Sequence, residues 1–207
     1  MALGTVIRSF ATPETLPTGI AWDGARLWLA DWDLDRIYLI DPVTGTVIRS
    51  FASPAAQPAG LAYDGSTLWV VDDGANTVYQ LEPLTGIVKR SIGLAFQTSG
   101  IVHNGKNLWI SSDATGFIYL VDPVSEVVLR SFAAHGTGRG QELAWDGKSL
   151  WLIQRDNDVI CQIDPVTGNA IRSCAHPDQA PYGVTWDGRA LWTGGFASDK
   201  IYQAMVN

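Results

Sequence analysis

Glu142 is the residue whose type and position most clearly indicate chemistry. It lies in one of five similar segments, and the equivalent residue in the other four is glycine: Gly19, Gly60, Gly100 and Gly183. A carboxyl group taken out of water holds its proton more tightly, and nearby carboxylates strengthen this effect. Glu142, with Asp31 or Asp72 close by, is therefore a candidate general acid or base.

Two other roles remain open for Glu142. It could bind a divalent cation in a central channel, because carboxylate oxygens suit calcium or magnesium. The candidate ligands are Asp72, Asp73, Asp113 and Glu142. It could instead be a solvated rim charge, or an ion-pair partner of Arg139 or Arg155, since clustered carboxylates also occur in structural networks. The sequence indicates no other cofactor.

Further candidates lie in segments that differ between the five repeats. Binding residues concentrate on variable loops held by a rigid scaffold. The candidate binding residues are Asp31, Trp32, Asp33, Asp72, Asp73, Asp113, Glu142, Arg155, Tyr182 and Phe196. Together with Phe96, their aromatic rings and carboxylates would suit a sugar or a cationic ligand. His135 and His176 lack a spaced third ligand, so they are weak metal candidates.

The elements that position these residues follow from a regular repeat. A tryptophan recurs at spacings of 41, 40, 42 and 41 residues: Trp28, Trp69, Trp109, Trp151 and Trp192. A fixed period of this length is typical of repeat architectures. Each of the first four repeats contains four short runs rich in β-branched and aromatic residues, separated by Asp-Gly or Asn-Gly hairpin signals and by Asp-Pro or Glu-Pro turns. The pattern predicts four antiparallel strands per repeat.

The strands are apolar on both faces, so each sheet must be covered on both sides. Radial packing of five sheets does this and predicts an all-β, five-bladed β-propeller. We expect a single domain over residues 1–207. The predicted blades lie at about 17–51, 58–92, 98–132, 140–174 and 181–207.

The last repeat ends after its third strand, and the start of the chain matches the missing fourth one. Residues 4–10 read GTVIRSF, as do residues 45–51. We predict that this N-terminal strand completes the last blade and closes the ring, which removes a free sheet edge. The loops that follow the second and fourth strands then share one face, where we expect the binding surface.

Composition narrows the range of partners. The net charge of −7 disfavours nucleic acid and anionic membrane surfaces. No apolar run is long enough for a transmembrane helix. Met1 is followed almost at once by a predicted strand rather than by a signal peptide, so we expect a cytoplasmic protein. We expect a monomer that binds a small molecule, a protein or a peptide.

Segments such as GIAWDGARLWLAD and IYLIDPVTGTVIRSF resemble the repeats of the YVTN, NHL and streptogramin-lyase-like bacterial propellers. The resemblance covers the whole chain and implies a propeller fold. That superfamily includes lyases, lactonases, cyclotransferases and binding modules, so the fold does not assign an activity. The segment GQELA at 140–144 is also similar to the Gly-Glu-Gly strand of plant-type glutamine cyclotransferases, which are five-bladed enzymes.

Three functions remain open at this point. The first is a binding module that uses the variable loop face, favoured because no Ser-His-Asp set, cysteine nucleophile or metal motif stands out. The alternative is a propeller enzyme of the lyase, lactonase or cyclotransferase type, which uses a carboxylate at the central funnel. The third is a repeat scaffold without a small-molecule site.

Overall fold

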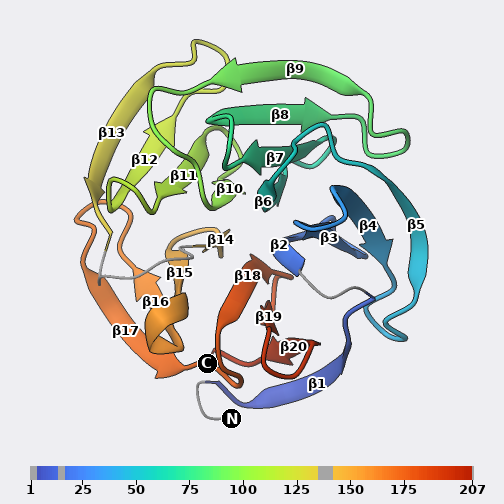
Figure 1. Ribbon diagram of the computed structural model, residues 1–207. Coiled ribbons are helices and arrows are strands. Elements are labelled where there is room, and N and C mark those ends of the chain that lie inside the picture. The colour runs from blue at the N-terminus through green and yellow to red at the C-terminus, as the bar shows by residue number, and fades with distance from the viewer. Residues whose placement is uncertain (1–3, 14–16, 135–141, 207) are drawn as a thin grey trace.

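The chain forms a closed ring of five four-stranded antiparallel sheets, shown in Figure 1. This computed structural model describes residues 4–13, 17–134 and 142–206. The strands of each sheet follow one another from the axis outward, and the described residues contain no α-helix, only a 3₁₀ turn at Arg155–Asn157. The predicted all-β, five-bladed β-propeller is confirmed.

The strands fall into four concentric layers (Figure 1). The innermost are β2 (Pro17–Trp22), β6 (Pro58–Tyr63), β10 (Ile101–His103), β14 (Leu143–Trp145) and β18 (Pro181–Trp186). The second are β3 (Leu27–Asp31), β7 (Leu68–Asp72), β11 (Leu108–Ser112), β15 (Leu150–Gln154) and β19 (Leu191–Gly195). The third are β4 (Arg36–Ile40), β8 (Thr77–Leu81), β12 (Phe117–Val121), β16 (Val159–Ile163) and β20 (Lys200–Ala204). The outermost are β5 (Val47–Ala52), β9 (Val88–Gly93), β13 (Val128–Ala133), β17 (Ala170–Ala175) and β1 (Val6–Ala11).

The N-terminal strand closes the ring as predicted. Strand β1 pairs antiparallel with β20, so that Phe10 lies opposite Ile201. Beyond the strand, the Gly4 amide donates to the Met205 carbonyl at 2.8 Å, and the Met205 amide donates to the Thr5 carbonyl at 2.9 Å. The two ends of the described chain therefore complete one sheet.

One hydrogen bond recurs between the first hairpin of a blade and the tryptophan that follows it. Asp64 accepts the backbone amides of Ser66 and Thr67 through Oδ1, and its Oδ2 accepts the indole N–H of Trp69 at 2.8 Å. The same indole bond is made to Asp23, Asp146 and Asp187. A single carboxylate thus fixes the turn and orients a large core side chain.

The third blade departs from this pattern. Asn104 takes the place of the aspartate and still accepts backbone amides of its turn. The indole nitrogen of Trp109, however, is buried and finds no hydrogen-bond partner in the described structure. An unsatisfied buried donor lowers stability.

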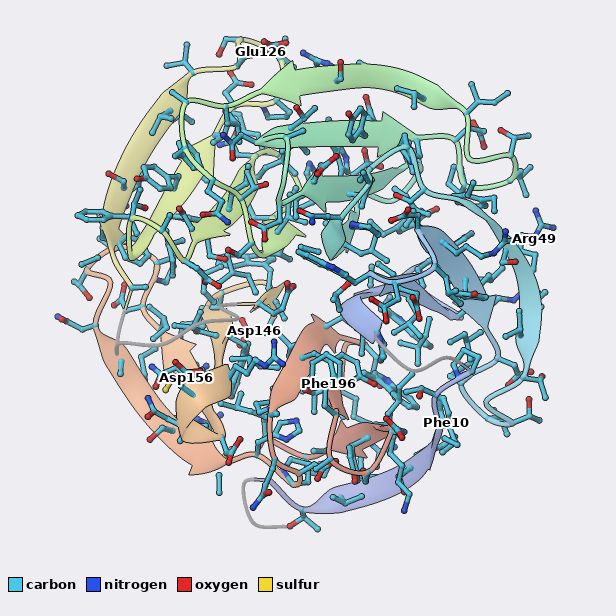
Figure 2. The ribbon with its side chains drawn as sticks, viewed as in Figure 1. Phe10, Arg49, Glu126, Asp146, Asp156 and Phe196 are labelled. Carbon is cyan, nitrogen blue, oxygen red and sulfur yellow. The ribbon has the colours of Figure 1, made fainter. Side chains whose placement is uncertain are left out.

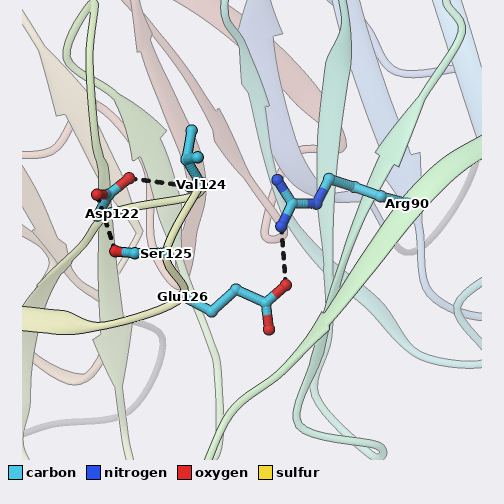
Figure 3. A network of polar contacts seen from close by, with 5 residues as sticks. All are labelled: Arg90, Asp122, Val124, Ser125 and Glu126. Carbon is cyan, nitrogen blue, oxygen red and sulfur yellow. Dashed lines mark hydrogen bonds and ion pairs between the residues drawn. The ribbon is translucent and has the colours of Figure 1, made fainter.

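Adjacent blades are joined at the outer rim, where Arg49 and Glu126 lie in Figure 2. At Gly86, with φ of +74°, a Cβ would come within 2.4 Å of the Phe51 ring of the preceding blade. The next turn has Glu126 instead, also at positive φ (62°), and Ile92 stands where the other blades have a phenylalanine or a cysteine. The smaller side chain leaves room for the Cβ of Glu126. Its carboxylate pairs with Arg90 at 2.8 Å (Figure 3).

None of the helical segments within residues 4–13, 17–134 and 142–206 has the length and hydrophobicity that a membrane span requires.

The unsatisfied indole predicts a stabilising substitution. Asn104→Asp supplies the missing acceptor to Trp109 and keeps the turn hydrogen bonds, so we expect the free energy of unfolding to rise by about 1 kcal/mol. Chemical denaturation measures this directly. The matched reverse change, Asp146→Asn, removes an existing indole bond of 2.8 Å and should lower stability. An unchanged or reduced stability of Asn104→Asp would contradict this account.

Asp64 predicts a pH dependence of stability. Burial alone raises the pKa of Asp64, but hydrogen bonds from Thr67, Trp69 and Ser66 hold it well below its usual range. As the pH falls, the unfolded chain therefore binds a proton at Asp64 before the folded chain does. The stabilisation is complete above the unfolded pKa of about 3.9 and is lost as the pH falls from there toward the folded pKa. Urea titrations from pH 6 to pH 2 should show a smaller acid loss for Asp64→Asn than for wild type. Parallel pH curves would contradict the prediction.

Candidate functional site

A cavity of about 390 Å³ lies around the axis, where the second strands end and the innermost strands begin. Its lining residues are Thr18, Trp32, Asp33, Ala59, Asp73, Ser99, Asp113, Glu142, Arg155, Pro181, Tyr182 and Phe196. Every blade contributes to it. The volume is in the range of small-molecule sites.

The mouth of the cavity is a ring of five equivalent residues. Each is the first residue after the second strand of its blade: Trp32, Asp73, Asp113, Arg155 and Phe196. Because the strands are in the same register, one position of the repeat faces the axis five times. This position differs in almost every blade, whereas the strands around it hardly change. We call these five residues the mouth ring.

Below the mouth ring, the innermost strands approach so closely that side chains are excluded. A Cβ on Gly19 would lie 2.4 Å from the carbonyl oxygen of Ala59, and one on Gly60 would lie 2.8 Å from the amide of Ile101. Contacts this short are sterically forbidden, so neighbouring blades require glycine here. In the fourth blade the corresponding residue is Glu142, which immediately precedes β14.

The backbone of Glu142 is hydrogen-bonded to the second strand of its blade, and its side chain is enclosed by the surrounding blades. Its carbonyl accepts the amide of Ile153 at 3.0 Å, just as the carbonyl of Gly100 accepts the amide of Ser111. The residue is only 7 % exposed, and no described residue hydrogen-bonds to its carboxyl group. Burial raises the pKa of Glu142 well above its usual range, and the negative charge of Asp113 raises it further. The cavity thus contains a carboxyl group that favours its protonated, neutral form.

Two aspartates of the mouth ring form the acidic side of the cavity. Asp73 accepts a hydrogen bond from the Gln97 side chain. Burial raises the pKa of Asp73, Gln97 partly offsets this, and the charges of Asp113 and Asp72 raise the pKa again. Asp113 is half-buried and acts electrostatically on both Asp73 and Glu142. The carboxyl groups of blades two to four are therefore coupled across the cavity.

The opposite side is aromatic and contains one cation. The Arg155 guanidinium lies 4.6 Å from the centre of the Phe196 ring, a cation–π contact. Phe196 in turn packs on Tyr182, with ring centroids 4.7 Å apart, and in Figure 2 it lies inside the ring of blades. Gly194 makes room for Tyr182, because a Cβ there would fall 2.0 Å from its ring. Trp32 packs against the cluster that contains Ala59.

The structure brings eight of the ten candidate binding residues into this cavity: Trp32, Asp33, Asp73, Asp113, Glu142, Arg155, Tyr182 and Phe196. Asp31 and Asp72 do not line it. Asp31 accepts the amide of Leu34, and Asp72 accepts the amides of Ala56, Gly74 and Ala75, so both carboxylates stabilise their own loops. The expectation that Asp31 or Asp72 acts on Glu142 is wrong, because the neighbouring charge belongs to Asp113.

Two other aromatic and imidazole candidates lie away from the cavity. Phe96 stacks on Tyr119 with centroids 3.8 Å apart, where it covers the outer part of the third blade. His176 is buried, and its ring nitrogens contact Thr193 and Asp178. His135 and Arg139 fall outside the described residues.

The described residues contain no group of three or more His, Cys, Asp or Glu side chains arranged to hold a metal ion. Of the four candidate ligands, Asp73, Asp113 and Glu142 line the cavity, while Asp72 is engaged by loop amides. The divalent cation stays a prediction.

Sequence reasoning missed the small residues of the cavity wall, Thr18, Ala59 and Ser99. They are equivalent positions, one residue before the axial glycines, and Tyr182 is the large member of the same set. The repeat register itself was the signal that could have found them.

No protein-family model matches this chain. No curated protein matches its sequence either. The solved structures that share its fold include glutaminyl cyclase of Myxococcus xanthus, with 12% identity, a TM-score of 0.83, and coverage of 97% of this chain and 94% of that one. Virginiamycin B lyase of Staphylococcus aureus has 18% identity and a TM-score of 0.59, covering 96% of this chain and 69% of that one. At these identities the likeness shows the fold alone: the protein is a five-bladed β-propeller, and its neighbours in structure include enzymes.

The raised pKa of Glu142 predicts the pH dependence of stability at this site. The unfolded chain releases the Glu142 proton near pH 4.3, whereas the folded chain retains it. The native state then binds more protons, so wild-type stability falls as the pH rises from 4 toward the folded pKa. Glu142→Gln has no such proton to lose. Denaturation at pH 4 and pH 8 should therefore show that its free energy of unfolding, relative to that of wild type, is higher at pH 8 than at pH 4. A constant difference between the two proteins would contradict the prediction.

Proposed function

We propose that this propeller is an acid–base enzyme of the glutaminyl cyclase type, with Glu142 as its general acid. The observation that carries the proposal is a buried carboxyl group, 7 % exposed and without a hydrogen-bond partner among the described residues, at the base of a central cavity. The full-length likeness to a glutaminyl cyclase supports the choice of reaction.

The cyclisation of an N-terminal glutamine requires a proton donor and a proton acceptor. In the cyclisation of an N-terminal glutamine, the α-amino nitrogen bonds to the side-chain amide carbon, and the bond from that carbon to the amide nitrogen breaks. The attacking nitrogen loses a proton, and the leaving nitrogen gains one to depart as ammonia. No other reactant is consumed. Protonated Glu142 would donate this proton to the leaving nitrogen, because a neutral acid buried near the reacting atoms is a suitable proton donor.

Asp113 is the residue that we propose as the proton acceptor. It lines the same cavity and is close enough to Glu142 to raise the pKa of that group. Two carboxyl groups in different environments can divide the acid and base roles between them. Asp113 is half-buried and Glu142 is enclosed, which is the arrangement that such a division requires.

A second candidate is a binding module for a cationic ligand. It is favoured by one observation: the Trp32, Tyr182 and Phe196 rings share a cavity with the carboxylates of Asp73 and Asp113. Aromatic faces and carboxylates both attract cations. Saturable binding without turnover would identify this function.

The deciding assay follows an N-terminal glutaminyl peptide by mass spectrometry, scoring the loss of one ammonia against a reaction without protein. Glu142→Gln should lower the rate by roughly 10²–10⁴-fold, the usual contribution of a general acid or base. Glu82→Gln is the matched control, because it makes the same chemical change in a turn at the opposite end of the propeller. No rate above background in the wild type, or full activity in Glu142→Gln, would overturn the proposal.

The divalent cation is tested in the same assay. Calcium or magnesium held by Asp73, Asp113 and Glu142 would make the rate depend on added metal and abolish it after chelation. It would also raise the thermal melting temperature of the wild type but not of Glu142→Gln. If the rate and the melting temperature are unchanged by both added metal and chelation, a divalent cation takes no part in the mechanism.

A further inference from the structure

Two aromatic side chains of the cavity wall share one support that lies outside the cavity. Tyr182 and Phe196 line the cavity and pack on each other, with ring centroids 4.7 Å apart. His176 does not line it, but its two ring nitrogens contact Thr193 and Asp178, which hold the backbone next to both rings. We propose that His176 is a positioning residue that fixes Tyr182 through Thr193 and Phe196 through Asp178, and so sets the shape of the ligand site. The inference rests on the proposed function only in treating this cavity as the working site.

A buried polar pair replaces apolar packing in the fifth blade. Thr193 occupies a core position of β19, and the equivalent residues of the other blades are Leu29, Val70, Ile110 and Leu152. Its hydroxyl lies 2.9 Å from Nε2 of His176 and donates to the carbonyl of Gly183 at 3.0 Å. Both Thr193 and His176 are buried. An aliphatic side chain would give more hydrophobic stabilisation at this position, so the polar pair indicates a role other than packing.

The hydroxyl of Thr193 holds the backbone that carries Tyr182. Strand β18 is bulged at Gly183, which has a φ of +49°, because Tyr182 pairs with Gly194 and the next paired residue, Val184, pairs with Thr193. A bulge of this kind redirects a neighbouring side chain. The hydroxyl of Tyr182 is buried and has no hydrogen-bond partner within the described residues. The ring is therefore placed by packing and by its backbone, which the bond from Thr193 to Gly183 fixes.

The other imidazole nitrogen orders the loop that holds Phe196. Nδ1 of His176 accepts the amide of Asp178 at 3.0 Å. The carboxylate of Asp178 in turn accepts the amide of Ser198 at 3.1 Å and also the Ser198 hydroxyl. The amide of Phe196 donates to the carbonyl of Ala180, in the same loop, at 3.3 Å. The contacts on both sides of Phe196 thus come from the loop that His176 orders.

These hydrogen bonds require a neutral imidazole. Because Nδ1 accepts the amide of Asp178, the ring proton lies on Nε2, where it is donated to Thr193. A second proton on Nδ1 would face that amide, so the loop would have to exchange it for the Asp178 carbonyl, which lies 2.9 Å from Nδ1. Burial lowers the pKa of His176, and the hydrogen bond and charge of Asp178, with the charge of Asp158, partly offset this effect. Protonation below neutral pH should therefore move the loop.

Four other titratable groups lie around the imidazole: Asp178, Asp158, Cys174 and Tyr202. Burial raises the pKa of Cys174, so this thiol keeps its proton near neutral pH. Burial alone raises the pKa of Asp178, but hydrogen bonds from its loop and from Ser198 lower it below its usual value, so it stays ionised. The change of charge just below neutral pH is assigned to the imidazole, whose residue type titrates there. His176 opens onto a groove that shares no lining residue with the cavity, so it can exchange protons without contact with a ligand.

Nuclear magnetic resonance of protein labelled at tyrosine and phenylalanine tests the link between pH 8 and pH 5 without any substrate. The Tyr182 and Phe196 signals, assigned with Tyr182→Phe and Phe196→Leu, should move with the same midpoint as the His176 imidazole. His176→Gln should abolish this movement. His103→Gln is the matched control and should leave it intact, because His103 lies beside the first hairpin of the third blade, at the opposite end of the propeller.

A pair of variants separates the hydrogen bond from packing and does not depend on titration. At pH 8, Thr193→Val keeps the shape but removes the hydroxyl, so the Tyr182 signal should shift. Thr193→Ser keeps the hydroxyl and should leave the signal near its wild-type position. In the cyclase assay, Thr193→Val should raise KM roughly tenfold, equivalent to about 1.4 kcal/mol of binding free energy, and should change kcat less, because Glu142 is not displaced. This pair also serves if His176→Gln does not fold.

The outcomes separate the positioning role from the proposed reaction. Ring signals that follow His176 in a protein without turnover support the role and reject the cyclase. Turnover combined with ring signals that stay constant while His176 titrates overturns the role and leaves the cyclase standing. Ring movement that persists in His176→Gln, a Tyr182 signal that is unmoved by Thr193→Val, or an equal shift in Thr193→Ser and Thr193→Val also overturns the role.

Discussion

Close packing at the axis is the constraint on which this molecule depends. Five inner strands meet there, and the backbone of one blade fills the space where a side chain of the next would lie. Glycine at four of the five positions permits this approach, and the closed ring follows from it. The remaining position, in the fourth blade, is Glu142, and the same close packing leaves this residue only 7 % exposed.

The scaffold and the cavity use the repeat in opposite ways. The hairpin aspartates, the core tryptophans and the inter-blade contacts at the rim recur from blade to blade. Where one member changes, a neighbour changes with it: Glu126 replaces a turn glycine next to Ile92, and it gains an ion pair with Arg90. The residues of the mouth ring share no contact that recurs in all five blades, and their side chains differ from blade to blade. An asymmetric site can therefore exist within a nearly symmetric ring.

The sequence predicted the architecture almost completely, because a propeller depends on periodic features that are visible in one chain. The period of about 41 residues, the hairpin signals and the match between residues 4–10 and 45–51 were sufficient for the blades and for ring closure. The axial position of Glu142 followed from its alignment with four glycines. These inferences concern backbone register, which sequence pattern determines well.

The candidate site was less predictable, because it depends on the direction of individual side chains. Asp72 and Asp73 are neighbours in sequence, yet Asp72 turns to its own loop amides and Asp73 faces the cavity. Phe96 is as apolar as Phe196, but it finds a partner in Tyr119. Thr18, Ala59 and Ser99 attract no notice as residue types, although their register places them on the cavity wall.

Burial in the axial cavity raises the pKa of Glu142 well above its usual range, so we expect this carboxyl group to keep its proton at a pH where ordinary carboxyl groups have lost theirs. An infrared difference spectrum between wild type and Glu142→Gln at pH 7 tests it most directly, because a protonated carboxyl group has a carbonyl band distinct from the bands of a carboxylate. We expect a protonated-carboxyl band in the wild type that shifts in heavy water and is absent from the variant. A difference spectrum that contains only carboxylate bands would contradict it.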